Sequence, residues 1–388
     1  MAVNRKRAKF YIYYFLIFAF MFVTVSGEVQ AAPSVSSQRA ILMDQETGRV
    51  LYEKDAHTES RIASITKIMT AVLAVESGKM DQVVTVSENA AGTEGSSLYL
   101  KAGEKIKLED LVYGLMLRSG NDAAVAIAEF VGGSLDGFTY LMNEKANEIG
   151  MENTHFSNPH GLDDHEDHYS TAYDMAVLTR YSMKNDMYKE ISGTKVHTAP
   201  NPDEKWDRKW KNKNRLLTEL YKFSTGGKTG YTKLAKRTLV STATKDGENL
   251  ISVTLNGPDD WNDHIAMFEF GFKQYDYRVV LEKGKIEKMD DEIYKGHAYL
   301  KRESVLTLTD EEVGEVKVEY KMLKPKQEWL KNQQVPDVVG KAVVYLGEKE
   351  VDTLPVYYQS FVKEKEKKSW WKFWAYSFEA FTGVRNNG

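Results

Sequence analysis

The pattern of hydrophobic and polar positions predicts a mixed helix-and-strand domain over residues 34–275. Short apolar runs at 40–43 and 50–52 flank the turn residues Thr47 and Gly48 and predict two strands. Apolar residues at helical spacing, together with β-rich runs further on, predict the remaining elements. These are helices at 62–75, 108–117, 122–131 and 137–149, and strands at 238–244 and 250–255.

A different pattern begins near residue 277. Apolar residues alternate with lysine and glutamate over 316–322, which is the period of a strand with one buried face. Runs at 343–346 and 351–358 predict two further strands, joined by a turn at 347–349. Together these runs predict a small all-β domain at 276–361.

The first 31 residues have the layout of a secretory signal. Basic residues at 5–9 precede 16 uncharged, mostly apolar residues at 10–25, and small residues at Val29 and Ala31 suit cleavage after Ala31. The alternative is an uncleaved membrane helix, although a membrane span needs ~20 residues. The signal predicts that the protein is exported.

Residues 362–388 predict an amphipathic membrane anchor. A charged run at 363–368 is followed by an aromatic-rich stretch, and a helix would place Trp370, Trp374, Phe378 and Phe381 on one face. Such a face suits the membrane–water interface, which here would be the outer face of the cytoplasmic membrane. The alternative is a helix docked on the protein's own surface.

Charge and composition argue against several classes of function for this protein. Loss of residues 1–31 would take away four basic residues and one acidic residue, so the formal net charge would change from −4 to −7. A protein this acidic is a poor candidate for binding nucleic acid. The basic stretch at 205–215 is interrupted by Asp207 and two tryptophans, and we interpret it as a solvated loop. The chain has no cysteine, which excludes disulfides and thiolate metal sites.

A serine and a lysine stand one helical turn apart at the start of the helix predicted over 62–75. Lys67 is the only charged residue of that helix, and a helix that is apolar all round is normally buried. Burial lowers the pKa of a lysine, so Lys67 could accept a proton from Ser64 and activate it as a nucleophile. By itself the S-x-x-K spacing is common. The alternative is a capping serine followed by a solvated lysine.

Two tripeptides further along the chain make the pattern specific. Ser119, Gly120 and Asn121 lie between two predicted helices, and K-T-G at 228–230 precedes the strand predicted at 238–244. Each tripeptide alone would suit an ordinary turn. S-x-x-K, S-x-N and K-T-G in this order are the motif set of class A β-lactamases and penicillin-binding proteins.

The chain resembles the low-molecular-mass D-alanyl-D-alanine carboxypeptidases, a family of penicillin-recognising serine hydrolases. The resemblance spans the mature chain and is carried by residues 61–70, 117–124, 158–163 and 227–232. Residues 257–264 are most similar to the sporulation carboxypeptidase of endospore-forming bacteria. The resemblance implies an α+β fold of the β-lactamase/transpeptidase type, with an antiparallel sheet flanked by helices, then a small all-β domain and a C-terminal amphipathic helix.

It also implies catalytic roles and a substrate. Ser64 would attack the carbonyl between two D-alanines of a peptidoglycan stem peptide, with Lys67 as general base. Ser119 would relay a proton to the departing D-alanine, and Asn121 would hydrogen-bond the substrate or Lys67. No cofactor is implied, and β-lactam antibiotics would be covalent inhibitors.

The third motif is assigned to substrate binding by the same resemblance. Lys228 and Thr229 would meet the terminal carboxylate, and Gly230 would let the substrate backbone approach. The backbone N–H groups of Ser64 and Tyr231 would form an oxyanion hole, which is typically worth ~3–4 kcal/mol per donor.

Three other functions remain as alternatives. Acidic residues and histidines crowd into 160–168, but Pro159 and Gly161 predict a loop and no zinc motif is present, so we predict no metal site. A class A β-lactamase would have an E-x-x-x-N pattern between Asn121 and Lys228, and none occurs there. A non-catalytic penicillin-binding receptor would not need all three motifs.

Overall fold

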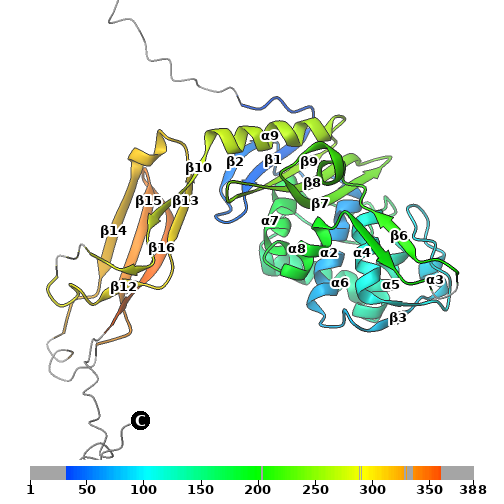
Figure 1. Cartoon of the computed structure of the whole chain (residues 1–388), viewed down its shortest axis with the longest axis horizontal. Helices are drawn as coiled ribbons and strands as arrows, with labels where there is room; N and C mark the ends of the chain where they lie inside the picture. Colours follow the sequence, from blue (N-terminus) through cyan, green and yellow to red (C-terminus); the bar gives the residue numbers. More distant parts are fainter. Residues whose placement is uncertain are drawn as a thin grey trace, which may run out of the picture. The chain divides into compact units, whose positions relative to one another are not determined.

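The computed structural model describes residues 32–201, 204–287, 289, 291–326, 329 and 335–359. The chain divides into two compact units between Gln274 and Tyr275, and each is treated by itself (Figure 1). The predicted signal at 1–31 and the predicted anchor at 362–388 lie outside the described residues. No helix among the described residues is long and apolar enough to cross a membrane.

The first unit is built on a five-stranded antiparallel sheet with the strand order β2-β1-β9-β8-β7. Its strands are β1 (Arg39–Asp44), β2 (Val50–Lys54), β7 (Ser224–Thr232), β8 (Lys236–Lys245) and β9 (Glu248–Leu255). Among the described strands, β7 pairs with β8 alone, so it is an edge strand of this sheet.

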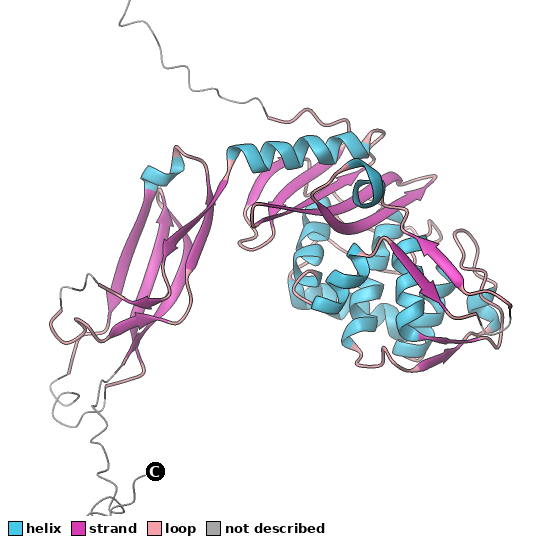
Figure 2. Cartoon of the chain, viewed as in Figure 1, coloured by secondary structure: helices cyan, strands magenta, loops and turns pink. Residues whose placement is uncertain are grey.

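Helices cover both faces of this sheet (Figures 1 and 2). One face carries a helical layer, and α9 packs on the other against β8 and β9. The layer consists of α2 (Lys67–Glu76), α4 (Leu108–Arg118), α5 (Asn121–Gly132), α6 (Leu135–Ile149), α7 (Ala172–Ser182) and α8 (Asp186–Gly193). Helix α9 spans Asp260–Gln274, and the short elements are α3 (Glu88–Ala91), the 3-10 turn η1 (Ala63–Thr66) and the π-helical turn η2 (Leu216–Leu220). Two small antiparallel two-stranded sheets, β3 (Val83–Thr85) with β4 (Lys105–Lys107) and β5 (Val196–Ala199) with β6 (Arg208–Lys211), complete the unit.

Strand alternation explains how the sheet sits between two apolar layers. Ile41 and Met43 belong to the core shared with the helical layer. Leu42 points the other way, where a Cβ on Gly271 of α9 would lie 2.9 Å from its side chain. A strand buried on both faces has a continuous apolar sequence, which is what residues 40–43 show.

The start of the helix predicted at 62–75 differs in detail. Ser64 lies in η1, and the α-helix itself begins at Lys67. Ala63 has a φ of +51°, so the chain turns sharply just before the serine. The basic stretch at 205–215 is also more ordered than a solvated loop, because Arg208–Lys211 forms β6 and Arg208 makes an ion pair with the buried Glu104.

The second unit is all-β. Strands β10 (Asp276–Leu281) and β13 (Ser304–Leu308) pair, and a five-stranded sheet has the order β11-β12-β16-β15-β14. Its strands are β11 (Gly284–Lys285), β12 (Ala298–Leu300), β14 (Val316–Met322), β15 (Val338–Leu346) and β16 (Lys349–Tyr358), with a 3-10 turn, η3, at Glu312–Glu315. Leu306, Val344, Leu354 and Val356 are in its own core. The α+β fold class is confirmed.

Candidate active site

Lys67 connects three parts of the chain at the centre of the first unit. Its Nζ lies 2.9 Å from Ser64 Oγ, 2.7 Å from Asn121 Oδ1 and 2.7 Å from the backbone oxygen of His160. The lysine begins α2, the asparagine begins α5, and His160 belongs to the loop between α6 and α7. The structure therefore places the S-x-x-K pair and the asparagine of S-x-N in direct contact.

The environment of Lys67 favours its uncharged form. The side chain is fully buried, and burial is the largest cause that lowers its pKa well below the ordinary value. The positive charges of Lys228 and Lys213 lower this pKa further, while Asp122 opposes them. A buried lysine of this kind can serve as a proton acceptor near neutral pH.

Ser119 and Asn121 are positioned by the corner between α4 and α5. Ser119 caps the C-terminus of α4 in the left-handed conformation, with a φ of +65°, and Asn121 begins α5 two residues later. Asn121 Nδ2 donates to the backbone oxygen of Glu94 at 2.7 Å, which leaves Oδ1 directed at Lys67. The corner thus holds two polar side chains at the buried end of two apolar helices.

Lys228 lies in the middle of β7 and is 1% exposed. Its Nζ donates to Ser119 Oγ at 3.0 Å and to the backbone oxygen of Thr229 at 2.6 Å. Burial lowers the pKa of Lys228 to about 7, and the charge of Lys213 contributes. The third motif is therefore joined to the second by a direct hydrogen bond.

A cleft of about 310 Å³ runs along these motifs, and its wall includes Ser64, Ser119, Thr229, Gly230 and Tyr231. The free side of edge strand β7 can pair with an extended peptide. Gly230 lets β7 pack closely against Ser64, because a Cβ at this position would lie 2.3 Å from Thr238 Oγ1 and 3.0 Å from the Ser64 nitrogen. A second cavity of about 200 Å³, next to Val72 and Tyr188, contains none of the predicted site residues.

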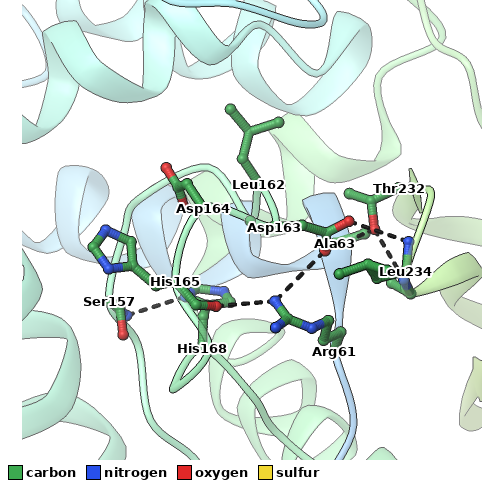
Figure 3. Close-up of polar contacts among 12 residues, drawn as sticks. Arg61, Ala63, Ser157, Leu162, Asp163, Asp164, His165, His168, Thr232 and Leu234 are labelled. Atoms are coloured by element: carbon green, nitrogen blue, oxygen red, sulfur yellow. Dashed lines mark hydrogen bonds and ion pairs between the residues drawn. The ribbon is translucent and has the colours of Figure 1, made fainter.

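The loop at 157–168 makes polar contacts with segments next to the first and third motifs (Figure 3). Asp163 accepts hydrogen bonds from Thr232 Oγ1 at 3.0 Å and from the Leu234 nitrogen at 3.2 Å, both just after the K-T-G motif. The Arg61 guanidinium, just before Ser64, lies 3.8 Å from the same carboxylate and donates to the His165 oxygen at 2.9 Å. The loop therefore contacts both the segment before Ser64 and the segment after the K-T-G motif.

The two buried histidines of this loop have protein partners. His168 Nδ1 accepts from the Ser157 nitrogen at 3.1 Å, and its Nε2 lies 2.8 Å from Thr66 Oγ1. Burial lowers the pKa of both His160 and His168 to about 3. Among the described residues, no three histidine or acidic side chains are placed to hold a metal ion.

Five cleft residues were not predicted as site residues. The cleft is also lined by Ser96, Lys213, Arg237, Asp260 and Trp261. Lys213 lies in the basic stretch interpreted as a solvated loop, and no motif marks it. The carbonyl of His160 was missed for a different reason, because a backbone acceptor leaves no signature in the sequence.

Comparison with known proteins decides the family. The sequence profile described as D-alanyl-D-alanine carboxypeptidase matches residues 26–259, which is more than half of the chain. The chain belongs to the D-alanyl-D-alanine carboxypeptidase family. Residues 275–364 match the profile described as the C-terminal domain of penicillin-binding protein 5. The resemblance inferred from the motifs is confirmed.

The chain is also similar to individual proteins of this family. The D-alanyl-D-alanine carboxypeptidase DacF of Bacillus subtilis (strain 168) is 36% identical over 325 residues, covering 78% of this chain and 80% of that protein. The crystal structure of penicillin-binding protein 5 from Haemophilus influenzae covers 85% of this chain and 98% of its own, with a TM-score of 0.69 and 27% identity. The D-alanyl-D-alanine carboxypeptidase structure from Mycobacterium tuberculosis H37Rv covers 64% of this chain and 95% of its own, with a TM-score of 0.60 and 29% identity.

Proposed function

We propose that this protein is a serine-type D-Ala-D-Ala carboxypeptidase, which removes the terminal D-alanine from peptidoglycan stem peptides through an acyl-enzyme on Ser64. The observation that carries the proposal is the contact between Ser64 Oγ and the Nζ of a fully buried lysine, 2.9 Å away, at the wall of a cleft. A serine next to a base of lowered pKa is an activated nucleophile.

Acylation follows from this arrangement. Ser64 Oγ would attack the carbonyl between the two D-alanines while its proton passes to neutral Lys67. The backbone N–H groups of Ser64 and Tyr231 would stabilise the oxyanion. As the C–N bond breaks, Ser119 would give its proton to the departing amine and take one from Lys228, which lies 3.0 Å away.

Deacylation reverses the proton movements. Water would add to the ester carbonyl and lose one proton through Ser119 to Lys228. Lys67 would return its proton to Ser64 as the ester bond breaks, so both lysines regain their starting states. A β-lactam would form the corresponding ester with Ser64, so β-lactam antibiotics would be covalent inhibitors.

The proposal extends to the place of action. Residues 1–31 would direct export as a signal peptide, residues 34–275 would be the catalytic domain and 276–361 the small β domain. Residues 362–388 would hold the enzyme on the outer face of the cytoplasmic membrane, as an amphipathic helix with four aromatic residues on one face. The similarity to a Bacillus subtilis carboxypeptidase supports a role in a spore-forming bacterium, at the wall or spore cortex.

The test uses the protein without its first 31 residues and a diacyl-tripeptide ending in D-Ala-D-Ala. Mass spectrometry should show release of one D-alanine, and a fluorescent penicillin should label the protein. Ser64→Ala should lose both activities completely while its circular dichroism spectrum stays unchanged, because no other atom can form the ester. Labelling of Ser64→Ala at the wild-type level would reject the assignment. Rapid loss of the penicillin label would indicate a β-lactamase instead, and a stable label without D-alanine release would indicate a receptor.

A further inference from the structure

Asp122 is a buried carboxylate next to the site, and the proposed reaction does not use it. It follows Asn121 in the first turn of α5, and its side chain is fully buried. A buried carboxylate is stable only when hydrogen bonds or a cation satisfy it. The partners of Asp122 therefore indicate why a charge is kept at this position.

Three groups of one loop donate hydrogen bonds to this carboxylate. Its Oδ2 accepts from Ser97 Oγ at 2.6 Å, from the Leu98 nitrogen at 2.8 Å and from the Leu100 nitrogen at 3.2 Å. Between the two leucines, Tyr99 has a φ of +61°, a conformation that is unfavourable for a bulky side chain. The carboxylate thus fixes a turn that the sequence of the loop does not favour by itself.

The same loop encloses the amide of Asn121. We call residues 94–100 the wall segment, because Ser96 lines the cleft. The oxygen of Glu94 accepts from Asn121 Nδ2 at 2.7 Å, and the oxygen of Ser96 accepts from the Asn121 nitrogen at 2.6 Å. Gly95 has a φ of +91°, and a Cβ there would lie 2.6 Å from Asn121 Nδ2. The backbone of the wall segment is therefore packed directly against the amide group.

This contact decides which end of the amide faces Lys67. The oxygen of Glu94 can only accept a hydrogen bond, so it selects the NH₂ end and leaves Asn121 Oδ1 for Lys67 Nζ, 2.7 Å away. A turned amide would present N–H donors to Lys67 instead. Neutral Lys67 would then accept a hydrogen bond from Asn121 with the lone pair that has to take the proton of Ser64.

We propose that Asp122 is a positioning residue for the acylation of Ser64: its carboxylate holds the wall segment, and the wall segment holds the amide oxygen of Asn121 on Lys67. This rests on the proposed function, in which neutral Lys67 accepts the serine proton. Asp122 contacts neither the nucleophile nor its base and acts through residues 94–100. Its negative charge also raises the pKa of Lys67, in opposition to burial.

The first test is Asp122→Asn in the protein without its first 31 residues. Asparagine has a similar size, but it has one acceptor oxygen instead of two and places N–H donors beside the donors of the wall segment. The plateau rate of labelling by a fluorescent penicillin, counted per folded molecule, should fall by about 10- to 100-fold, as expected when a catalytic group is misplaced.

The pH profile of the same variant separates positioning from charge. The acid limb should move to lower pH, because loss of the negative charge lowers the pKa of Lys67 further. An acid limb that moves while the plateau stays at the wild-type rate would show that Asp122 acts through its charge alone, and the positioning role would be wrong.

Ser97→Ala tests the route from the other side of the contact. It removes one donor of the wall segment and keeps the charge of Asp122, so the plateau should fall by about 3- to 10-fold, the range expected for one hydrogen bond. The double variant should lose little more than Asp122→Asn, because both changes act on one segment. Losses that multiply would mean that the two residues act independently. If Asp122→Asn does not fold, a Ser97→Ala plateau at the wild-type rate rejects the inference.

Asp174→Asn is the matched control. Asp174 is also buried in the first turn of a helix, α7, where its Oδ2 accepts from the Asn153 nitrogen at 2.8 Å and from Thr154 Oγ1 at 2.7 Å. It is not among the residues that line the cleft. Its replacement should lower the melting temperature, but labelling per folded molecule should stay within about 2-fold, because distant sites act independently. A plateau loss as large as that of Asp122→Asn would overturn the inference, since any buried carboxylate would then have the same effect.

The outcomes also separate this inference from the proposed function. If the wild-type protein is labelled by penicillin but releases no D-alanine, the carboxypeptidase function fails and the labelling comparison remains valid. If the wild-type protein is not labelled at all, a crystal structure of Asp122→Asn tests the inference by itself. Asn121 Oδ1 should then lie beyond hydrogen-bond distance of Lys67 Nζ, and an Asn121 side chain that keeps its place would reject the positioning role.

Discussion

At the scale of single residues, the hydrogen-bond partners of Lys67 show why its protonation state would control the reaction. The Asn121 and His160 oxygens can only accept hydrogen bonds. A neutral lysine has two N–H groups and one lone pair, so donation to these two oxygens turns the lone pair toward Ser64. A protonated lysine would instead donate its third N–H to Ser64 and could not take the serine proton.

This geometry predicts a pH dependence for acylation. In the proposed reaction neutral Lys67 is the active form, so the second-order rate of labelling by a fluorescent penicillin should fall as the pH drops through the lowered pKa of Lys67 and reach a plateau above it. Lys67→Arg should label roughly 100-fold more slowly or worse at every pH, because a guanidinium does not lose its proton in this range.

Lys145→Arg is the matched control for this substitution. Lys145 makes ion pairs with Glu76 and Glu148 and takes no part in the proposed chemistry, so its replacement should leave both the rate and the pH profile unchanged. A labelling rate that stays constant from pH 5 to pH 10 in the wild-type protein would contradict the role of Lys67 as base.

How much of the site the sequence predicts depends on the kind of group. The motif side chains are predictable, because S-x-x-K puts Ser64 and Lys67 one turn apart on any helix. The left-handed corner at Ser119 and the acceptor carbonyl of His160 are not predictable. Both depend on how distant segments pack, and neither needs a particular side chain. The position of Lys213 at the cleft is not predictable from the sequence for the same reason, since only the tertiary fold brings it there.

At the scale of elements, the loop at 157–168 fits closely against η1, the turn that carries Ser64. Thr70 Oγ1 donates to the Pro159 oxygen at 2.6 Å, and Gly161 has a φ of +83°. A Cβ on Gly161 would lie 1.9 Å from the Ala63 oxygen, far inside any real contact. The backbone of the loop thus rests directly on η1.

Gly161→Ala should therefore be strongly destabilising. The left-handed conformation costs about 1–2 kcal/mol for alanine, and relief of the clash with Ala63 adds about 1–3 kcal/mol. Urea unfolding should show the combined loss in the free energy of unfolding, and penicillin labelling should slow because η1 moves. Gly133→Ala is the control: its φ is +75° and a Cβ there meets nothing within 4 Å, so only the conformational cost should appear. Equal losses for the two variants would mean that the loop does not brace η1.

The elements themselves were predictable where the hydrophobic pattern is strong. Helices α4, α5 and α6 and strands β1, β8 and β9 were predicted, because their apolar faces repeat clearly. The hydrophobic pattern does not predict strand β7. It contains three glycines in nine residues, and glycine is unfavourable in strands. Its conformation comes from pairing with β8, which supplies a partner along its whole length.

At the scale of the whole molecule, the two units have separate cores. The apolar core of the first unit and that of the second share no residue. Every predicted catalytic and binding residue lies in the first unit, between Ser64 and Tyr231. The Mycobacterium tuberculosis structure matches 64% of this chain over 95% of its own length, so a related protein has little beyond the matched part.

A truncation series tests this division together with the membrane anchor. Residues 32–388, 32–361 and 32–274 would be expressed separately and mixed with vesicles that contain anionic lipid. All three should be labelled by penicillin at the same rate within about 2-fold, because no group at the cleft is removed.

Only 32–388 should sediment with the vesicles. Four aromatic side chains on one helical face would bury ~600–800 Å² of surface. At ~25 cal/mol per Å² this burial would contribute at most about 20 kcal/mol, which the cost of ordering the helix reduces. Sedimentation of 32–361 would place the membrane contact in the β domain, and a soluble but unlabelled 32–274 would show that the cleft depends on the second unit.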